Sequence, residues 1–143
     1  AEQLVPAELK EYIRFFDAPA IVHQFEEVPY HYFSVFDGLP TDDYDFVLID
    51  GPGPFLDKDK RFVEAPNGDI VILLKELKED ALVYLDQRHE TKRIIRFYLE
   101  SYLQPIAETG EYTLYRRTNK VYNPKEVVDI RHEGLKSFKY FQQ

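Results

Sequence analysis

The sequence predicts an α/β fold in which a mostly parallel sheet is flanked by helices and closed by an antiparallel C-terminal hairpin. Two runs of consecutive apolar residues, 46–49 and 82–85, are typical of strands in a parallel sheet. A segment with helical spacing follows each run. Because strands and helices alternate along the chain, we expect parallel strands joined by right-handed crossovers.

The first 33 residues predict one helix and one strand. Residues 6–16 begin with proline, which suits a first helical turn, and Leu9, Ile13 and Phe16 recur at helical spacing. Residues 20–25 form a short apolar run that indicates a strand. The pattern of the aromatic residues 30–33 does not decide between a helix and a strand.

Residues 44–49 give the strongest strand signal, and their four consecutive apolar residues predict burial on both faces. Asp50 follows this strand. Repeated glycine and proline from Gly51 and Pro52 onward predict a loop. Open α/β sheets bind ligands beyond the carboxyl ends of their strands, so this loop is either a substrate lid or a plain connection.

The next elements are a helix, a strand and a second helix. Asn67 is placed to cap a helix whose apolar positions recur at the i, i+3, i+4 and i+7 spacing. A strand over residues 81–85 then ends at Asp86, and a helix is expected over residues 90–103. The apolar positions of the two helices are Ile70, Leu73, Leu74 and Leu77 in the first, and Ile95, Tyr98, Leu99 and Tyr102 in the second.

Residues 106–108 and 112–116 predict the terminal hairpin, with Gly110 in its turn to accept a positive φ. We expect residues 1–118 to form one domain. Residues 119–143 are expected to be a C-terminal extension that packs on this domain or on a partner.

Composition excludes several classes of protein. The formal net charge of −8 argues against binding to nucleic-acid phosphates. The chain has no cysteine, hence no disulfide and no thiolate zinc site, and it lacks a signal-like start. No apolar run approaches the ~20 residues of a membrane helix. A cytoplasmic location is therefore expected.

In order, these elements resemble strands four to seven of the class I S-adenosylmethionine-dependent methyltransferases, which have a Rossmann-like sheet. The resemblance rests on residues 44–52 with their Ile-Asp-Gly-Pro ending, on residues 69–85, on Asp86 and on the hairpin. It implies methyl transfer from S-adenosylmethionine to an oxygen or nitrogen of a small-molecule or polymer substrate.

One part of the family pattern is missing. Members open with a strand, a Gly-x-Gly-x-Gly turn, a helix and a strand ending in an acid that binds the cofactor ribose. Here the glycines begin at Gly38, and Gly51-x-Gly53 follows the fourth strand instead. Either a preceding segment supplies the motif, with Ala1 marking an internal cut, or the domain has lost cofactor binding.

The candidate site residues follow the two buried strands. Asp50 and Asp86 end strands that are neighbours in the family's sheet, and the resemblance implies a magnesium ion there, with Gln87 in place of an adjacent amide ligand. The alternative is that these aspartates only cap turns. Gly51, Pro52, Asp86 and Gln87 are candidate substrate contacts.

Asp50 and His89 are the candidate catalytic residues. His89, three positions after Asp86, is a candidate general base on a substrate oxygen, because histidine readily exchanges a proton near neutral pH. The alternative is a solvent-facing residue at a helix start. No nucleophile elbow or phosphate loop supports a hydrolase or a kinase.

Two further readings stay open. One is a non-catalytic interaction or oligomerisation module, with a homodimer formed through an exposed hydrophobic sheet edge. The other is a different nucleotide-binding α/β fold.

Overall fold

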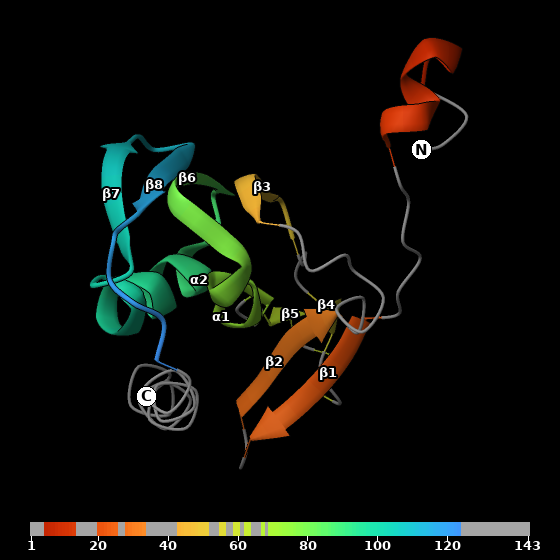
Figure 1. Cartoon of the computed structure of the whole chain (residues 1–143). Coiled ribbons are helices and arrows are strands. Elements are labelled where there is room, and N and C mark those ends of the chain that lie inside the picture. The colour runs from red at the N-terminus through yellow and green to blue at the C-terminus, as the bar shows by residue number, and fades with distance from the viewer. Residues whose placement is uncertain are drawn as a thin grey trace.

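A four-stranded sheet is the largest sheet among the described residues (Figure 1). The structure is a computed structural model that describes residues 5–13, 20–25, 28–33, 43–51, 55–56, 59–60, 62–63, 67 and 69–123. The strand order is β3-β6-β8-β7. The strands are β3 (Tyr44–Ile49), β6 (Leu77–Asp86), β7 (Leu103–Glu108) and β8 (Tyr112–Arg117).

The sheet is mixed. β3 and β6 are parallel neighbours, whereas β8 is antiparallel to both β6 and β7. This confirms the α/β class and the adjacent parallel pair predicted from residues 46–49 and 82–85. A mostly parallel sheet is not confirmed, because one of the three pairings in the described sheet is parallel.

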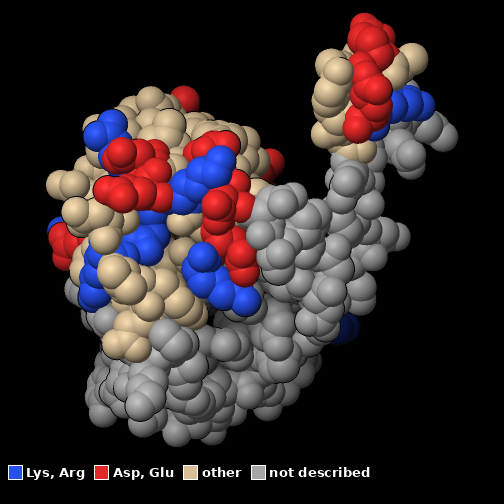
Figure 2. All heavy atoms as spheres, in the orientation of Figure 1, with Lys and Arg blue, Asp and Glu red and all other residues tan. Residues whose placement is uncertain are grey.

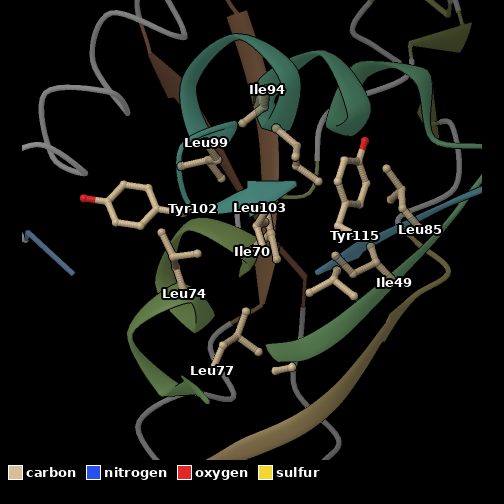
Figure 3. Close-up of a cluster of buried hydrophobic side chains, with 13 residues drawn as sticks. Ile49, Ile70, Leu74, Leu77, Leu85, Ile94, Leu99, Tyr102, Leu103 and Tyr115 are labelled. Atoms are coloured by element: carbon tan, nitrogen blue, oxygen red, sulfur yellow. The ribbon is translucent and has the colours of Figure 1, made fainter. Parts of the chain in front are cut away.

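Short helices cover one face of this sheet (Figure 1). They are α1 (Asp69–Leu73), the 3₁₀ turn η4 (Leu74–Glu76), α2 (His89–Ile94) and the π-helical turn η5 (Ile95–Leu99). Their apolar side chains pack against alternate residues of β6, β8 and β3 (Figure 3). The core consists of Ile49, Ile70, Leu74, Leu77, Ala81, Val83, Leu85, Ile94, Ile95, Leu99, Tyr102, Leu103 and Tyr115.

The opposite face of β3 is open. Phe46 and Leu48 are 53% and 59% exposed, whereas Ile49, on the helix side, is buried. The prediction that this strand is buried on both faces is therefore wrong. Four apolar residues in a row imply two apolar faces, but sequence alone does not show whether a second layer covers both.

The predicted helices end earlier in the structure. Leu77 opens β6 instead of closing the first helix, and Tyr102 lies beyond η5, directly before β7. Both side chains are nevertheless buried, so the apolar spacing correctly identified core positions. Gly110 has no positive φ, contrary to the expectation for the hairpin turn.

The N-terminal elements stand apart from the main sheet. The expected helix over residues 6–16 is a 3₁₀ helix, η2 (Ala7–Tyr12), and Ile13 is already extended; residues 14–16 lie outside the described residues. β1 (Ala20–Phe25) confirms the predicted strand and pairs antiparallel with β2 (Val28–Phe33), which resolves the ambiguous aromatic stretch. β4 (Phe55–Leu56) and β5 (Phe62–Val63) form a further two-stranded sheet.

Candidate functional site

The two predicted site aspartates lie at the same end of the sheet. β3 and β6 run parallel with Ile49 opposite Leu85, so Asp50 and Asp86 occupy the next position on neighbouring strands. Strands in a sheet are about 4.8 Å apart, which places the two backbones side by side. The adjacency expected from the sequence is thus present.

Arg88 fixes the position of Asp50. Its Nη2 donates to the Asp50 carbonyl oxygen at 3.2 Å and to the Asp50 carboxylate Oδ1 at 3.3 Å. The Arg88 Nε is buried and has no hydrogen-bond partner among the described residues. Arg88 thus links the residue after β3 to the turn after β6.

Asn67 ties the same region to the helices. Its Nδ2 donates to the Gly51 carbonyl at 3.2 Å, and its Oδ1 accepts from the Asp69 backbone N–H at 2.8 Å. The second contact supports the predicted role of Asn67 at the start of α1, because its side-chain oxygen accepts from the first N–H of that helix. Its backbone N–H also donates to the Thr91 Oγ1 at 2.8 Å, so one buried residue connects Gly51, α1 and α2.

A shallow pocket lies between the start of α2 and the hairpin turn. Its lining includes Gln87, Arg88, His89, Lys92 and Glu111, and its volume is about 20 Å³. The Gln87 backbone N–H donates to the Glu111 carbonyl at 3.0 Å, which holds the turn after β6 against the hairpin. A pocket of this size accommodates little more than a water molecule.

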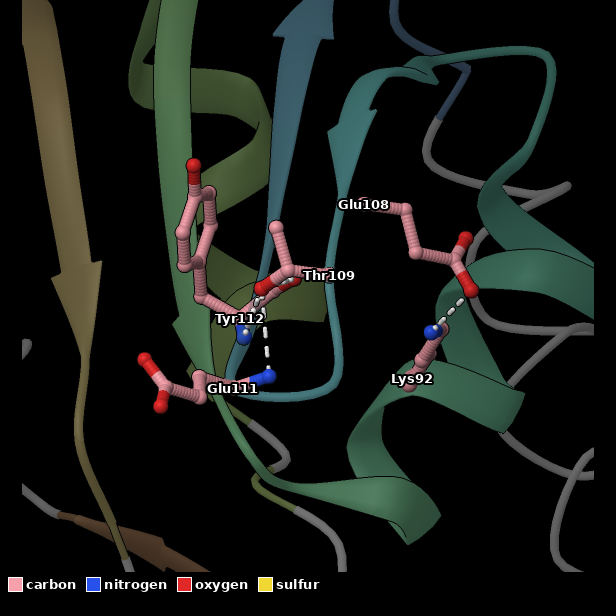
Figure 4. A network of polar contacts seen from close by, with 5 residues as sticks. All are labelled: Lys92, Glu108, Thr109, Glu111 and Tyr112. Carbon is pink, nitrogen blue, oxygen red and sulfur yellow. Dashed lines mark hydrogen bonds and ion pairs between the residues drawn. The ribbon is translucent and has the colours of Figure 1, made fainter.

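The hairpin turn beside this pocket is fixed by Thr109 (Figure 4). The Thr109 Oγ1 accepts from the backbone N–H groups of Glu111 and Tyr112, both at 3.1 Å. Next to this turn, the Lys92 Nζ on α2 donates to the Glu108 Oε1 at the end of β7 at 2.6 Å. This hydrogen bond and the lysine charge lower the pKa of the Glu108 carboxyl.

Two tyrosines border the aspartates. Tyr84 and Tyr112 stack with ring centroids 5.0 Å apart and an interplanar angle of 19°. Partial burial raises the pKa of Tyr84, and the negative charge of Asp86 raises it further. Tyr84 therefore stays a neutral hydroxyl group beside Asp86 at physiological pH.

The predicted site residues are mostly gathered at this end of the sheet. Asp50, Asp86, Gln87 and His89 all lie there, His89 as the exposed first residue of α2. Gly51 contributes a carbonyl to Asn67, while Pro52 lies outside the described residues.

Sequence reasoning missed the roles of Arg88 and Lys92. Arg88 directly follows Gln87 in a turn that the sequence predicts to be part of the site, and its positive charge near two predicted site aspartates was the available signal. Lys92 lies one helical turn after Arg88, and its backbone N–H donates to the Arg88 carbonyl at 2.8 Å.

The contacts of Asp50 disfavour a resident divalent cation. Magnesium takes six oxygen ligands, of which protein carboxylates often supply one or two and waters several, whereas calcium sites take more from the protein. Asp50 is already paired with a guanidinium group. Within the described residues, no three histidine, cysteine, aspartate or glutamate side chains gather around one point. Magnesium at Asp50 and Asp86 stays an untested prediction that the Arg88 contact disfavours.

The strand-end pocket is also too small for S-adenosylmethionine. Sites for ligands of that class enclose about 300–1,000 Å³. The strand-end pocket, at about 20 Å³, is more than tenfold smaller. It therefore suits one polar group of a ligand rather than a whole cofactor.

Surface charge is mixed rather than of one sign. Figure 2 shows acidic and basic side chains interspersed over the described part of the visible face. Ion pairs such as Lys92–Glu108 and Lys78–Asp45 account for some of this pattern. None of the helices in the described ranges is long and apolar enough to span a bilayer.

The fold and site together define an α/β-like domain with a mixed sheet. A cluster of polar side chains lies at the carboxyl ends of β3 and β6. No protein-family model matches the chain, and neither the curated proteins nor the solved structures include a significant match. The residues themselves therefore carry the functional argument.

Proposed function

We propose that this chain is the substrate-side part of a methyltransferase-like domain that transfers a methyl group from S-adenosylmethionine to a substrate oxygen or nitrogen. The observation that supports this most strongly is the side-by-side placement of Asp50 and Asp86 at the carboxyl ends of the parallel strands β3 and β6. Ligands of open α/β sheets bind beyond such ends.

The proposed roles follow from the contacts. Asp50, oriented by Arg88, accepts a hydrogen bond from a substrate hydroxyl or amine group. His89, exposed at the strand-end pocket, takes up the proton that this group loses. Gln87 lines the same pocket and supplies a neutral donor and acceptor for orienting the substrate.

The cofactor supplies the methyl group. In this proposal its glycine-rich binding turn comes from sequence outside these 143 residues, because neither the chain's motifs nor the described pocket provides one. The role of the present chain is accordingly to hold and orient the substrate.

The proposal is tested by calorimetric titration of the longest natural chain that contains these residues with S-adenosylmethionine. We expect saturable binding below millimolar concentration. An absence of heat at millimolar ligand would contradict the proposal.

A second arm measures S-adenosylhomocysteine formation with a panel of hydroxyl- and amine-bearing small molecules. Asp50→Asn is expected to lower turnover by about 10²-fold, in the range of a lost positioning or acid–base group. Asp45→Asn is the matched control, because Asp45 is exposed on the same strand and pairs with Lys78 away from the carboxyl end. Equal turnover in the two variants would show that Asp50 does not contribute to the site.

A further inference from the structure

The sheet has one open face, defined by three rows of side chains across β3, β6 and β8. The middle row is Leu48, Tyr84 and Leu114, which are cross-strand neighbours. The second row lies toward the start of β3. It consists of Phe46, Leu82 and Arg116. Asp50 and Asp86 lie one row away on the other side, with Tyr112 opposite Asp86.

This open face differs sharply from the helix-covered face. Val83, Leu85 and Tyr115, which point to the helices, are buried, whereas Phe46 and Leu48 are more than half exposed. Parallel strand pairs are normally covered on both faces, because each face carries apolar side chains. The open face is thus an apolar surface with Asp86 and the Arg88-paired Asp50 at one end and Arg116 at the other.

The dimensions of the open face fit a helix better than a second copy of the chain. Three strands and three rows span roughly 15 by 20 Å, given strand spacings of about 4.8 Å and about 6.6 Å between rows. A helix is about 10–12 Å wide, and about 13 residues extend 20 Å. A stable homodimer buries about 800 Å² of accessible surface on each partner, so a second copy would have to contact the chain well beyond these three rows.

We infer that the open face binds an amphipathic helix of a partner polypeptide, with the helix N-terminus over Asp50 and Asp86 and its C-terminus over Arg116. The helix dipole is positive at the N-terminus and negative at the C-terminus, so both ends meet opposite charge in this direction. The bound helix then runs antiparallel to β3 and β6. Lysine or arginine in its first turn and acid in its last turn complete the match.

The inference does not depend on methyl transfer, and two synthetic peptides test it. Both have 14 residues, the same composition and one leucine face. The first carries lysines in its first turn and glutamates in its last turn, and the second carries the reverse. The second is intrinsically the better helix, so a preference for the first must come from the protein.

Fluorescence anisotropy with the 143-residue chain is the measurement. We expect the first peptide to bind about tenfold more tightly than the second, equivalent to about 1.4 kcal/mol. Leu48→Asp is expected to abolish binding of both peptides, and Val121→Asp, at an 84% exposed position outside the sheet, to leave binding unchanged. Circular dichroism confirms that both variants are folded.

Three results would overturn the inference. The first is equal affinity for the two peptides, and the second is binding that survives Leu48→Asp. The third is a concentration-dependent dimer in sedimentation at pH 7 that Leu48→Asp dissociates, since the face would then serve a second copy of the chain.

Discussion

The pKa of the Tyr115 hydroxyl depends on its burial in the hydrophobic core. The side chain lies on β8 among the helix-facing residues and is 3% exposed. Burial raises the pKa of Tyr115 to about 12, and a hydrogen bond with Thr113 partly opposes this increase. The phenolate is disfavoured because it would have to exist in an apolar environment.

The raised pKa of Tyr115 predicts a loss of stability in base. A folded-state pKa above the unfolded value of about 10 gives stability that is complete below pH ~10 and is lost as the pH approaches 12. At about 1.4 kcal/mol per pH unit, the wild-type protein should lose roughly 3 kcal/mol more than Tyr115→Phe over this range. Denaturant unfolding at successive pH values measures the difference.

Tyr12→Phe serves as the control, because Tyr12 is 78% exposed and lies outside the core. At neutral pH, Tyr115→Phe should cost only about 1 kcal/mol for the lost hydrogen bond. A stability difference between wild type and Tyr115→Phe that stays constant from pH 8 to 12 would refute the burial explanation.

At the scale of elements, Asn67 joins three parts of the fold that are distant in sequence. Gly51 in the loop after β3, the start of α1 and the first turn of α2 all contact it. Asn67 is buried, so each of its polar atoms needs these partners. The geometry of the candidate site therefore depends on Asn67.

Asn67→Ala is predicted to destabilise the protein by about 2–3 kcal/mol, because it removes two side-chain hydrogen bonds and leaves the Asp69 N–H unsatisfied. Asn67→Asp retains the accepting oxygen for Asp69 but places a buried carboxylate against the Gly51 carbonyl oxygen, so it should destabilise the protein at least as much as Asn67→Ala. Urea unfolding measures both variants, with exposed Asn119→Ala as the control. Equal stability of Asn67→Ala and Asn119→Ala would contradict the linking role.

The sequence predicted which segments form the sheet better than where each element ends. Uninterrupted apolar residues located β3 and β6, and the cap at Asn67 located α1. Leu77 and Tyr102 have the spacing of helical core residues. In the structure, however, Leu77 is the first residue of β6 and Tyr102 directly precedes β7, and both are buried. Periodicity reports which face is apolar and does not identify the turn that ends a helix.

The candidate site was predictable in position but not in its contacts. The shared edge of Asp50 and Asp86 follows from parallel neighbours, since both strands end at the same side of the sheet. The Arg88 contact depends on how the turn after β6 bends back, which is a tertiary property. The pairing of residues 20–25 with residues 28–33 also required coordinates, because local pattern does not choose between strand partners.

At the scale of the whole molecule, net charge and the open face have opposite effects on association. At pH 7 the formal charge of −8 keeps molecules apart, whereas near the isoelectric point of about 5.0 this repulsion vanishes. Phe46 and Leu48 then remain as an exposed apolar surface. Association should therefore peak where charge no longer opposes contact between these surfaces.

Light scattering between pH 4 and 8 is predicted to show a maximum near pH 5 for the wild-type chain. Leu48→Ser should lower this maximum roughly twofold, because it removes apolar surface without changing the net charge. Val121→Ser alters an equally neutral and highly exposed position outside the sheet, and should leave the maximum unchanged. Equal scattering by the two variants would mean that charge neutralisation alone drives association, with no special contribution from the open face.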